Sequence, residues 1–155
     1  MNDARRLVVT PIGRLRTPWA TTSDCPRNGR RGDQPLCSVE VDAAFVAGLK
    51  DLEGYSHLIL LYWLDQAGVP EMVFTPPNDS APRGVFATRT PRRPNPIGLS
   101  VVKFEGFAAP GILRVRYLDC VDGTPLVDIK PYLRTTDCEP EASMGFQVLR
   151  LVPPT

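Results

Sequence analysis

Short runs of apolar residues recur along the whole chain, and proline, glycine and aspartate separate one run from the next. Many short strands with turn signals between them are typical of a β-sandwich or a β-barrel. The most apolar run, residues 57–64, predicts a strand that is buried on both faces. The same pattern predicts further strands at residues 7–12, 39–41, 71–75, 83–88, 100–107, 112–117, 126–130 and 146–152.

One segment instead has the spacing of a helix. Asp42 offers an N-cap oxygen, and Gly54 fits the position just after a helix end. Between them, four apolar residues recur at helical intervals: Phe45, Val46, Leu49 and Leu52. The sequence therefore predicts an all-β fold, a single, mainly antiparallel β-barrel with one short helix and long loops.

Length and composition fit one domain over residues 1–155, with a C-terminal tail from residue 134 that includes the last predicted strand. The 17 prolines are about twice the usual share, which favours turns and argues against a helical bundle. A net charge of +1 gives no general attraction to nucleic acid, so any RNA contact needs a local basic patch. We see no secretion signal, and residues 58–64 are too few to cross a membrane, so we expect a cytoplasmic protein.

The four cysteines do not form a recognisable metal site. Cys25, Cys37, Cys120 and Cys138 include no C-x-x-C pair, and the single histidine, His57, cannot complete a usual zinc pattern. We therefore expect reduced thiols and no metal. Cys25 and Cys120 are expected to be small buried apolar side chains rather than nucleophiles.

Residues 86–100, FATRTPRRPNPIGLS, interleave prolines with arginines between two predicted strands, and we call them the proline-arginine loop. Proline fixes its own φ and pushes the preceding residue, here Thr90, Arg93 and Asn95, into extended geometry. A stiff loop positions polar groups with little ordering cost on binding, and the planar fork of arginine suits phosphate or carboxylate. A rigid solvated loop without a ligand is the alternative interpretation.

Residues 119–132, DCVDGTPLVDIKPY, contain an Asp-Gly turn and then alternating apolar and charged residues, which alone indicates a hairpin. Together with residues 86–100, this string resembles the TsaA/TrmO family, S-adenosylmethionine-binding β-barrel proteins whose characterised members methylate tRNA. The resemblance spans roughly residues 8–133 and includes Pro11-Ile12-Gly13, Arg16-Thr17-Pro18, Cys25-Pro26-Arg27, and Gly48-Leu49 followed by Leu52-Glu53-Gly54-Tyr55-Ser56-His57-Leu58. Because the sequence has no Rossmann Gly-rich loop, the resemblance implies a cofactor site on a β-barrel, often completed across a homodimer interface.

The resemblance also implies which residues hold S-adenosylmethionine. Arg89 would bind the carboxylate of its amino-acid head, and the backbone around Asp119, Cys120 and Val121 would contact the adenine edge or the sulfonium. The other implied cofactor-binding residues are Pro26, Arg27, Asn28, Asp65, Gln66 and Ser100.

Two of these positions depart from the family pattern. Many members have a histidine where this chain has Asp65, followed by glutamine or a basic residue where it has Gln66. Asp65 cannot donate a hydrogen bond as histidine does, so only a backbone contact carries over there. Asn28 replaces a glutamine, which keeps the amide but shortens its reach.

By the same resemblance, the methyl acceptor is N6 of threonylcarbamoyl-adenosine at position 37 of tRNA, just 3′ of the anticodon. A carboxylate near the methyl group, Asp122 or Asp128, would accept the departing proton. For Asp122, a purely structural role in the hairpin turn is the alternative. For Asp128 we expect a structural pairing with a barrel arginine. The implied substrate-binding residues are Arg92, Arg93, Asn95, Lys130 and Tyr132.

Two other functions stay open. One is an S-adenosylmethionine-dependent methyltransferase that acts on a small molecule or another RNA. The other is a non-catalytic S-adenosylmethionine-binding module that reports cofactor level or acts through a partner. Longer bacterial members of the family carry an additional C-terminal domain implicated in tRNA recognition, so the resemblance implies a short, single-domain form here.

Overall fold

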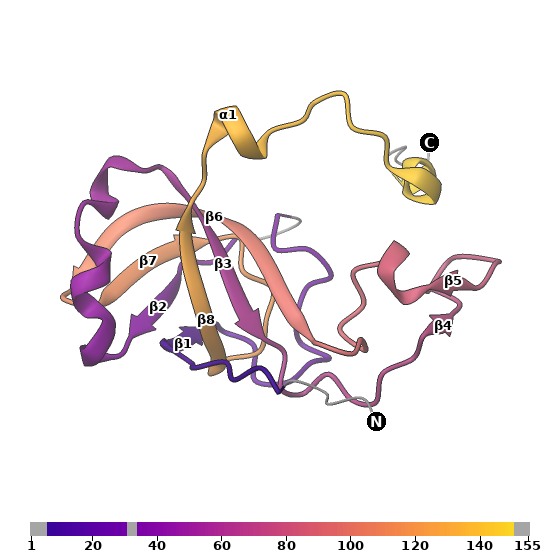
Figure 1. Cartoon of the computed structure of the whole chain (residues 1–155), viewed down its shortest axis with the longest axis horizontal. Helices are drawn as coiled ribbons and strands as arrows, with labels where there is room; N and C mark the ends of the chain where they lie inside the picture. Colours follow the sequence, from indigo (N-terminus) through magenta and orange to yellow (C-terminus); the bar gives the residue numbers. More distant parts are fainter. Residues whose placement is uncertain (1–5, 31–33, 151–155) are drawn as a thin grey trace.

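The computed structural model describes residues 6–30 and 34–150. Their strands form a closed antiparallel barrel in the order β1-β2-β7-β6-β3-β8, and β4 and β5 pair separately (Figure 1). The barrel strands are β1 (Gly13–Arg16), β2 (Cys37–Val41), β3 (His57–Trp63), β6 (Ile97–Ala109), β7 (Ile112–Arg116) and β8 (Thr124–Pro131). The prediction of an all-β, mainly antiparallel barrel is confirmed.

Alternate residues of each strand face the barrel interior, because successive side chains of a strand point to opposite faces. On β3, Leu58, Leu60 and Tyr62 are buried, whereas the residues between them are only partly buried. The predicted burial of this strand on both faces is therefore wrong, since its outer face is only partly covered. Other residues that are fully buried in the core are Leu15, Val39, Val102, Leu113, Val115, Leu118 and Leu126.

The long crossover from β3 to β6 carries a small arm that stands beside the barrel, at the right of Figure 1. The arm consists of β4 (Val73–Phe74), β5 (Arg83–Gly84) and the 3₁₀ helix η3 (Val85–Ala87). Among the described residues, no helix is long and apolar enough to cross a membrane.

The C-terminal chain leaves β8 and passes to the arm through α1 (Arg134–Asp137) and the 3₁₀ helix η4 (Gly145–Arg150) (Figure 1). Gln147 donates a hydrogen bond from Nε2 to the Ala87 carbonyl over 3.5 Å. The Arg83 guanidinium lies 4.3 Å from the centre of the Phe146 ring. The tail therefore packs on the arm through polar and cation–π contacts.

Three of the predicted strands are wrong. Residues 7–12 are an exposed lead-in, because Pro11 has no N–H to donate and pairing begins only at Ile12, whose N–H donates to the Leu126 carbonyl over 2.8 Å. Within residues 83–88, β5 gives way to η3, where the Thr88 hydroxyl donates back to the Val85 carbonyl over 2.9 Å. Residues 145–150 form η4 rather than a strand, and positions 151–152 lie outside the described residues.

The predicted helix is instead a pair of 3₁₀ helices, η1 (Ala43–Leu49) and η2 (Leu52–Gly54). Val46 and Leu49 of η1 and Leu52 of η2 pack on the core, and within η1 the spacing of three from Val46 to Leu49 is the 3₁₀ period. Asp42 precedes η1 in extended geometry but makes no side-chain cap bond. Gly54 is the last residue of η2 rather than the residue just after a helix end, so its predicted position is wrong. The left-handed residue of this segment is Asp51 (φ 67°).

Candidate functional site

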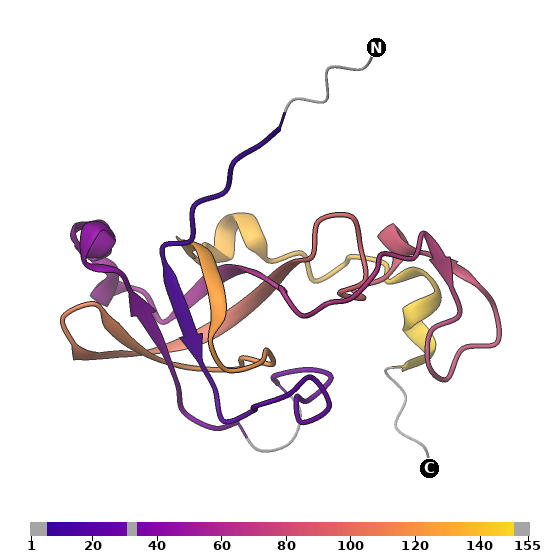
Figure 2. The ribbon, with the colours of Figure 1, turned by 90° about the horizontal axis from the view of Figure 1, so that it is seen from below.

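Residues 117–123, which connect β7 to β8, lie beside the loop that follows β1 (Figure 2). Thr17 donates a hydrogen bond from its hydroxyl to the Cys120 carbonyl over 2.8 Å. The N–H of Asp122 donates to the Trp19 carbonyl over 2.7 Å. These bonds fix the β7–β8 connection, which contains the predicted cofactor segment, against the N-terminal loop.

The same loop returns to the β7–β8 connection at Gly29. A side chain at this position would overlap the backbone carbonyl of Tyr117, so the close approach requires glycine. The Arg30 guanidinium lies 4.9 Å from the centre of the Tyr117 ring. Tyr117 has a left-handed φ of 82°, a conformation that costs a non-glycine residue of order 1–2 kcal/mol. The strained residue thus lies two positions before Asp119.

Asp119 is the ionisable group that these contacts surround. Its Oδ1 accepts a hydrogen bond from the Tyr62 hydroxyl over 3.1 Å, and its carboxylate also accepts one from the Gly29 N–H. Burial raises the pKa of Asp119 above its usual value, while the Tyr62 and Gly29 hydrogen bonds and the charge of Arg89 lower that pKa. Because this carboxylate has lost hydration, a cationic ligand group would be favourable beside it.

Ser100 reaches the site through Tyr62, whose hydroxyl oxygen lies 2.7 Å from Ser100 Oγ. The thiols of Cys25 and Cys120 lie near enough to Asp119 that its negative charge affects their pKa values. Burial raises the pKa of Cys25 and raises that of Cys120 to about 12. Both are therefore protonated at neutral pH, which argues against nucleophilic chemistry. Cys120 is buried as expected, whereas Cys25 is only half-buried.

The structure gathers most of the implied cofactor-binding residues. Pro26, Arg27 and Asn28 lie in the loop between Cys25 and Gly29, both of which interact with Asp119. Arg89 acts on Asp119 through its charge, and Ser100 through the Tyr62 hydroxyl. No signal other than a resemblance would have collected these separate segments.

Asp65 and Gln66 are exposed just beyond the end of β3. The N–H of Leu64 donates to the Pro96 carbonyl over 2.8 Å, so the two residues adjoin the end of the proline-arginine loop. Within the described part of the chain, no contact joins either side chain to Asp119. Their cofactor role stays a prediction.

The arginines of the proline-arginine loop differ in what they bind. Arg92 forms an ion pair with Glu71 (Nη2 to Oε1 2.7 Å) and donates from Nε to the Val69 carbonyl over 3.1 Å. Arg93 donates from Nη1 to the Thr88 carbonyl over 3.0 Å. Arg89 and Asn95 are exposed. Arg92 and Arg93 therefore brace the loop and keep only their remaining N–H donors for a substrate.

Lys130 and Tyr132 lie toward the opposite end of β3. Tyr132 donates from its N–H to the carbonyl of His57, the first residue of β3, over 3.2 Å, and the two rings meet edge-on at 6.3 Å. Lys130 forms an ion pair with Asp128 (Nζ to Oδ2 2.8 Å), so the expected pairing of Asp128 with an arginine is wrong. The structure does not bring Lys130 or Tyr132 to Asp119.

Asp122 has structural partners for both carboxylate oxygens. Oδ1 accepts a hydrogen bond from the Thr17 N–H over 3.0 Å, and Oδ2 lies 3.6 Å from Arg16 Nη1. Gly123 follows with a left-handed φ of 81°, which this turn requires. The contacts favour the structural interpretation, and the role of Asp122 as a proton acceptor stays a prediction.

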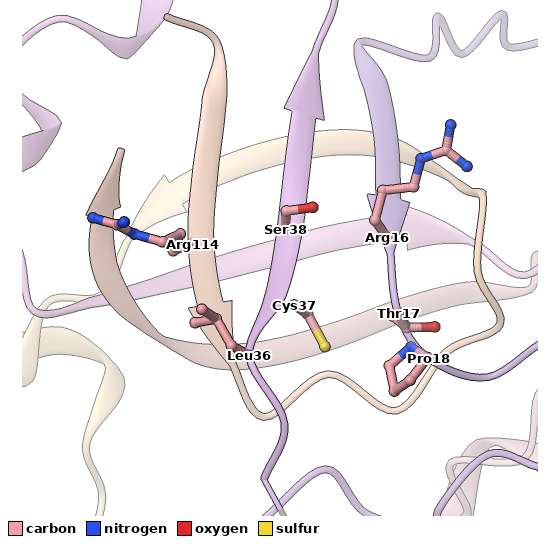
Figure 3. Close-up of a pocket in the computed structure, with 7 residues that line it drawn as sticks. All are labelled: Arg16, Thr17, Pro18, Leu36, Cys37, Ser38 and Arg114. Atoms are coloured by element: carbon pink, nitrogen blue, oxygen red, sulfur yellow. The ribbon is translucent and has the colours of Figure 1, made fainter. Parts of the chain in front are cut away.

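A hollow of about 380 Å³ opens on the neighbouring barrel surface, between the start of the N-terminal loop and β2. In Figure 3 its two arginines, Arg16 and Arg114, extend in different directions from β1 and β7, so their charges do not converge on one ligand position. Arg16 is also neutralised by Glu40 at 3.1 Å. We therefore place the candidate site at Asp119 and not in this hollow.

Sequence reasoning missed Tyr62, Gly29 and Gly98, which pairs with Tyr62 and leaves room for its ring. Tyr62 lies in the most apolar run of the chain, where its hydroxyl is conspicuous because a buried tyrosine usually needs a hydrogen-bond partner. The glycines gave no such signal, since close backbone approach is visible only in the fold. No cluster of His, Cys, Asp and Glu within residues 6–30 and 34–150 is arranged to hold a metal ion.

The raised pKa of Asp119 predicts a pH-dependent stability. Below the usual aspartate pKa the group is protonated in both folded and unfolded chains, so burial of its charge has no cost. As the pH rises through the raised folded value, the unfolded chain ionises more readily, and the free energy of unfolding falls. We expect the Asp119→Asn variant to gain stability relative to the natural chain as the pH rises above about 4, the usual pKa of aspartate. Urea unfolding of both proteins at each pH measures the difference, and a difference that stays constant with pH would contradict the assignment.

Comparison with known proteins places this chain in a family. Residues 14–138 match the model of the tRNA-methyltransferase O N-terminal domain. A protein of Archaeoglobus fulgidus named S-adenosyl-L-methionine-binding protein is 40% identical over 132 residues, which cover 85% of this chain and 94% of that protein. The tRNA (adenine(37)-N6)-methyltransferase of Escherichia coli K12 is 37% identical over 147 residues, covering 87% of this chain and 61% of the enzyme.

Solved structures agree with the sequence matches. The crystal structure of TrmO from Pseudomonas aeruginosa superposes with a TM-score of 0.79 at 34% identity, covering 99% of this chain and 67% of that one. The chain spans only 36% of the length of another relative, a probable S-adenosyl-L-methionine-binding protein of A. fulgidus that is 46% identical over 136 residues. The match over residues 14–138 and these levels of identity show that the chain belongs to the tRNA-methyltransferase O family.

Proposed function

We propose that this protein is an S-adenosylmethionine-dependent methyltransferase whose cofactor binds at Asp119. The observation that carries the proposal is a desolvated carboxylate held by three segments of the chain, with an arginine nearby. The names of the relatives support it, since they include S-adenosyl-L-methionine-binding proteins and a tRNA (adenine(37)-N6)-methyltransferase.

The residues at this end of the barrel fit the charges of the cofactor. The cofactor has cationic sulfonium and ammonium groups, which suit the Asp119 carboxylate, and an anionic carboxylate, which suits Arg89. Arg89 is exposed and makes no hydrogen bond or ion pair with other described residues, so its guanidinium is available. Pro26, Arg27 and Asn28 would close over the ligand from the N-terminal loop. When bound, S-adenosylmethionine supplies an electrophilic methyl group.

For the methyl acceptor we propose N6 of threonylcarbamoyl-adenosine at position 37 of tRNA, in the cytoplasm. The E. coli relative, whose name specifies adenine 37 and N6, supports this choice. The near-neutral chain has no general attraction to RNA, so Arg92, Arg93 and Asn95 on the stiff loop would supply the local contacts. Asp122 is the proposed proton acceptor in that reaction.

We propose further that two copies of the chain form a homodimer near the site. Apolar side chains on the outer face of β6 support this proposal, since Ile97 is 48% and Leu99 52% exposed in the single chain. Phe86, on η3, is 77% exposed. A solution mass of one 17.1 kDa chain would contradict it.

A second candidate function is a non-catalytic S-adenosylmethionine-binding module. The observation that favours it is that several relatives are named only for binding S-adenosyl-L-methionine. Formation of S-adenosylhomocysteine with any acceptor separates the two functions, because a binding module forms none.

Replacing Arg89 with alanine tests the cofactor site. Because loss of a charged hydrogen bond typically costs about 1.5–3 kcal/mol, we expect the dissociation constant for S-adenosylmethionine to rise roughly tenfold to a hundredfold. The melting temperature should change little, since Arg89 is exposed on a loop. Calorimetric titration measures both proteins, with Arg134→Ala, another exposed arginine, as the control. Normal cofactor affinity per folded Arg89→Ala molecule would show that Arg89 is not part of the site.

Charge reversal in the proline-arginine loop tests whether the protein binds tRNA as its substrate. If Arg92 contacts a phosphate, Arg92→Glu weakens tRNA binding and lowers the slope of log affinity against log salt by about 1. Lys50→Glu, a reversal at an exposed residue after η1, is the control for net charge. Filter binding of tRNA at several salt concentrations gives the slopes, after melting curves have shown that the variants fold. An unchanged slope in a folded Arg92→Glu variant would favour a small-molecule acceptor.

A further inference from the structure

The Tyr62 hydroxyl is a polar group within an apolar barrel. The side chain is only 3% exposed and packs in the same core cluster as Leu60, Val102 and Leu118. Phenylalanine would fill this volume equally well, so packing alone does not account for the hydroxyl. Its hydrogen bonds indicate another role.

The ring of Tyr62 packs against β6 at a position where the strand has a glycine. Tyr62 pairs with Gly98 in the β3–β6 register, and a side chain at position 98 would overlap the tyrosine ring. Ser100 lies two residues further along β6, on the same buried face. Gly98 thus makes room for the ring, and Ser100 meets its hydroxyl. This gives Gly98 and Ser100 a shared structural role beside the Tyr62 side chain.

Ser100, Tyr62 and Asp119 form a chain of two hydrogen bonds, and the donor of each bond can be assigned. An ionised carboxylate only accepts, so the Tyr62 hydroxyl donates to Asp119 Oδ1 over 3.1 Å. Its oxygen is then free to accept from the Ser100 hydroxyl over 2.7 Å. The chain of bonds therefore starts in the core at Ser100, passes through Tyr62 and ends on the carboxylate at the site.

The other contacts of Asp119 leave Tyr62 as its side-chain hydrogen-bond donor. The remaining donors are backbone N–H groups, those of Gly29 and of Asp119 itself, while Arg89 acts through its charge. The N–H of Gly29 belongs to a loop, whereas Tyr62 belongs to a strand paired on both sides. Tyr62 is thus the contact that ties the carboxylate to the rigid part of the fold.

We propose that Tyr62 is a positioning residue whose hydroxyl, supported by Ser100, orients the Asp119 carboxylate for the cationic part of S-adenosylmethionine. This inference rests on the proposed function and extends it to a residue inside the barrel. Without the hydroxyl, the carboxylate loses its fixed orientation while the ring still fills the core. A purely structural hydroxyl would instead affect stability and leave cofactor affinity unchanged.

The test is calorimetric titration of Tyr62→Phe with S-adenosylmethionine. We expect roughly tenfold weaker binding, the usual effect of losing one hydrogen bond to a charged group. The control is Tyr55→Phe, the same chemical change at an exposed residue, which should bind as the natural chain does. Where Tyr62→Phe does not fold, Ser100→Ala replaces it, because this change removes the support and keeps the bond to Asp119.

A double-mutant cycle shows whether Tyr62 acts through Asp119. If it does, the Tyr62→Phe/Asp119→Asn double variant binds the cofactor no more weakly than Asp119→Asn alone. Fully additive losses overturn the proposal, as does normal affinity in a Tyr62→Phe variant that has only a lower melting temperature.

The failure of the inference is distinguishable from the failure of the proposed function. If the natural chain binds no S-adenosylmethionine, the proposed function fails and the cofactor role of Tyr62 falls with it. If the natural chain binds and Tyr62→Phe binds equally well, only the inference fails. A ligand-free measurement supports the link independently: NMR titration of the Asp119 carboxyl should show a higher pKa in Tyr62→Phe, because a hydrogen bond that lowers it is lost. The groups that face Asp119 in that titration are Tyr62, the Gly29 N–H, Arg89, Cys25 and Cys120.

Discussion

Pairing of β1 with both β2 and β8 closes the barrel, and the candidate site depends on that closure. β1 is short, yet the residues at its end hold the β7–β8 connection: the Leu15 carbonyl accepts from the Gly123 N–H over 2.8 Å, and the Thr17 hydroxyl binds the Cys120 carbonyl. The chain after Thr17 then returns to Asp119 at Gly29. A barrel that was open at β1 would leave Asp119 without one of its backbone donors and without the loop of implied cofactor residues.

The charges of the site follow a consistent division. Asp119 is partly desolvated and bound by neutral donors, whereas Arg89, the nearby cation, forms no ion pair with another described residue. Arg92 and Arg93 are bound to a carboxylate and to carbonyls of their own loop and arm. Asp119 and Arg89 thus form a pair of opposite charges that is available for a zwitterionic ligand. Arg92 and Arg93 instead stabilise the loop and the arm. This division follows from hydrogen bonds that the sequence alone does not reveal.

The sequence predicted those parts of the fold that local pattern determines. Short apolar runs and turn residues identified β2, β3, β6, β7 and β8, although the continuous apolar run of β3 wrongly predicted that both its faces are buried. The sequence pattern wrongly predicted a strand at residues 7–12, an apolar run that precedes β1. It also wrongly predicted one α-helix in residues 43–54, which form two 3₁₀ helices.

Within the candidate site, the sequence strings identified the segments around Arg89 and Asp119 through a family resemblance. They did not identify Tyr62, since its contact with Asp119 joins residues 57 positions apart in the chain. Gly29 was missed for the same reason, because its role is to approach the carbonyl of Tyr117. Long-range contacts of this kind depend on barrel closure and strand register, which no local pattern encodes.

The central proposal is that this chain transfers a methyl group from S-adenosylmethionine to threonylcarbamoyl-adenosine in tRNA. The most direct measurement is to incubate the purified protein with S-adenosylmethionine and tRNA carrying threonylcarbamoyl-adenosine, and to follow the mass of the modified nucleoside together with S-adenosylhomocysteine. The account predicts a gain of one methyl group matched by an equal amount of S-adenosylhomocysteine. A folded protein that binds the cofactor but forms neither product with this tRNA would contradict it.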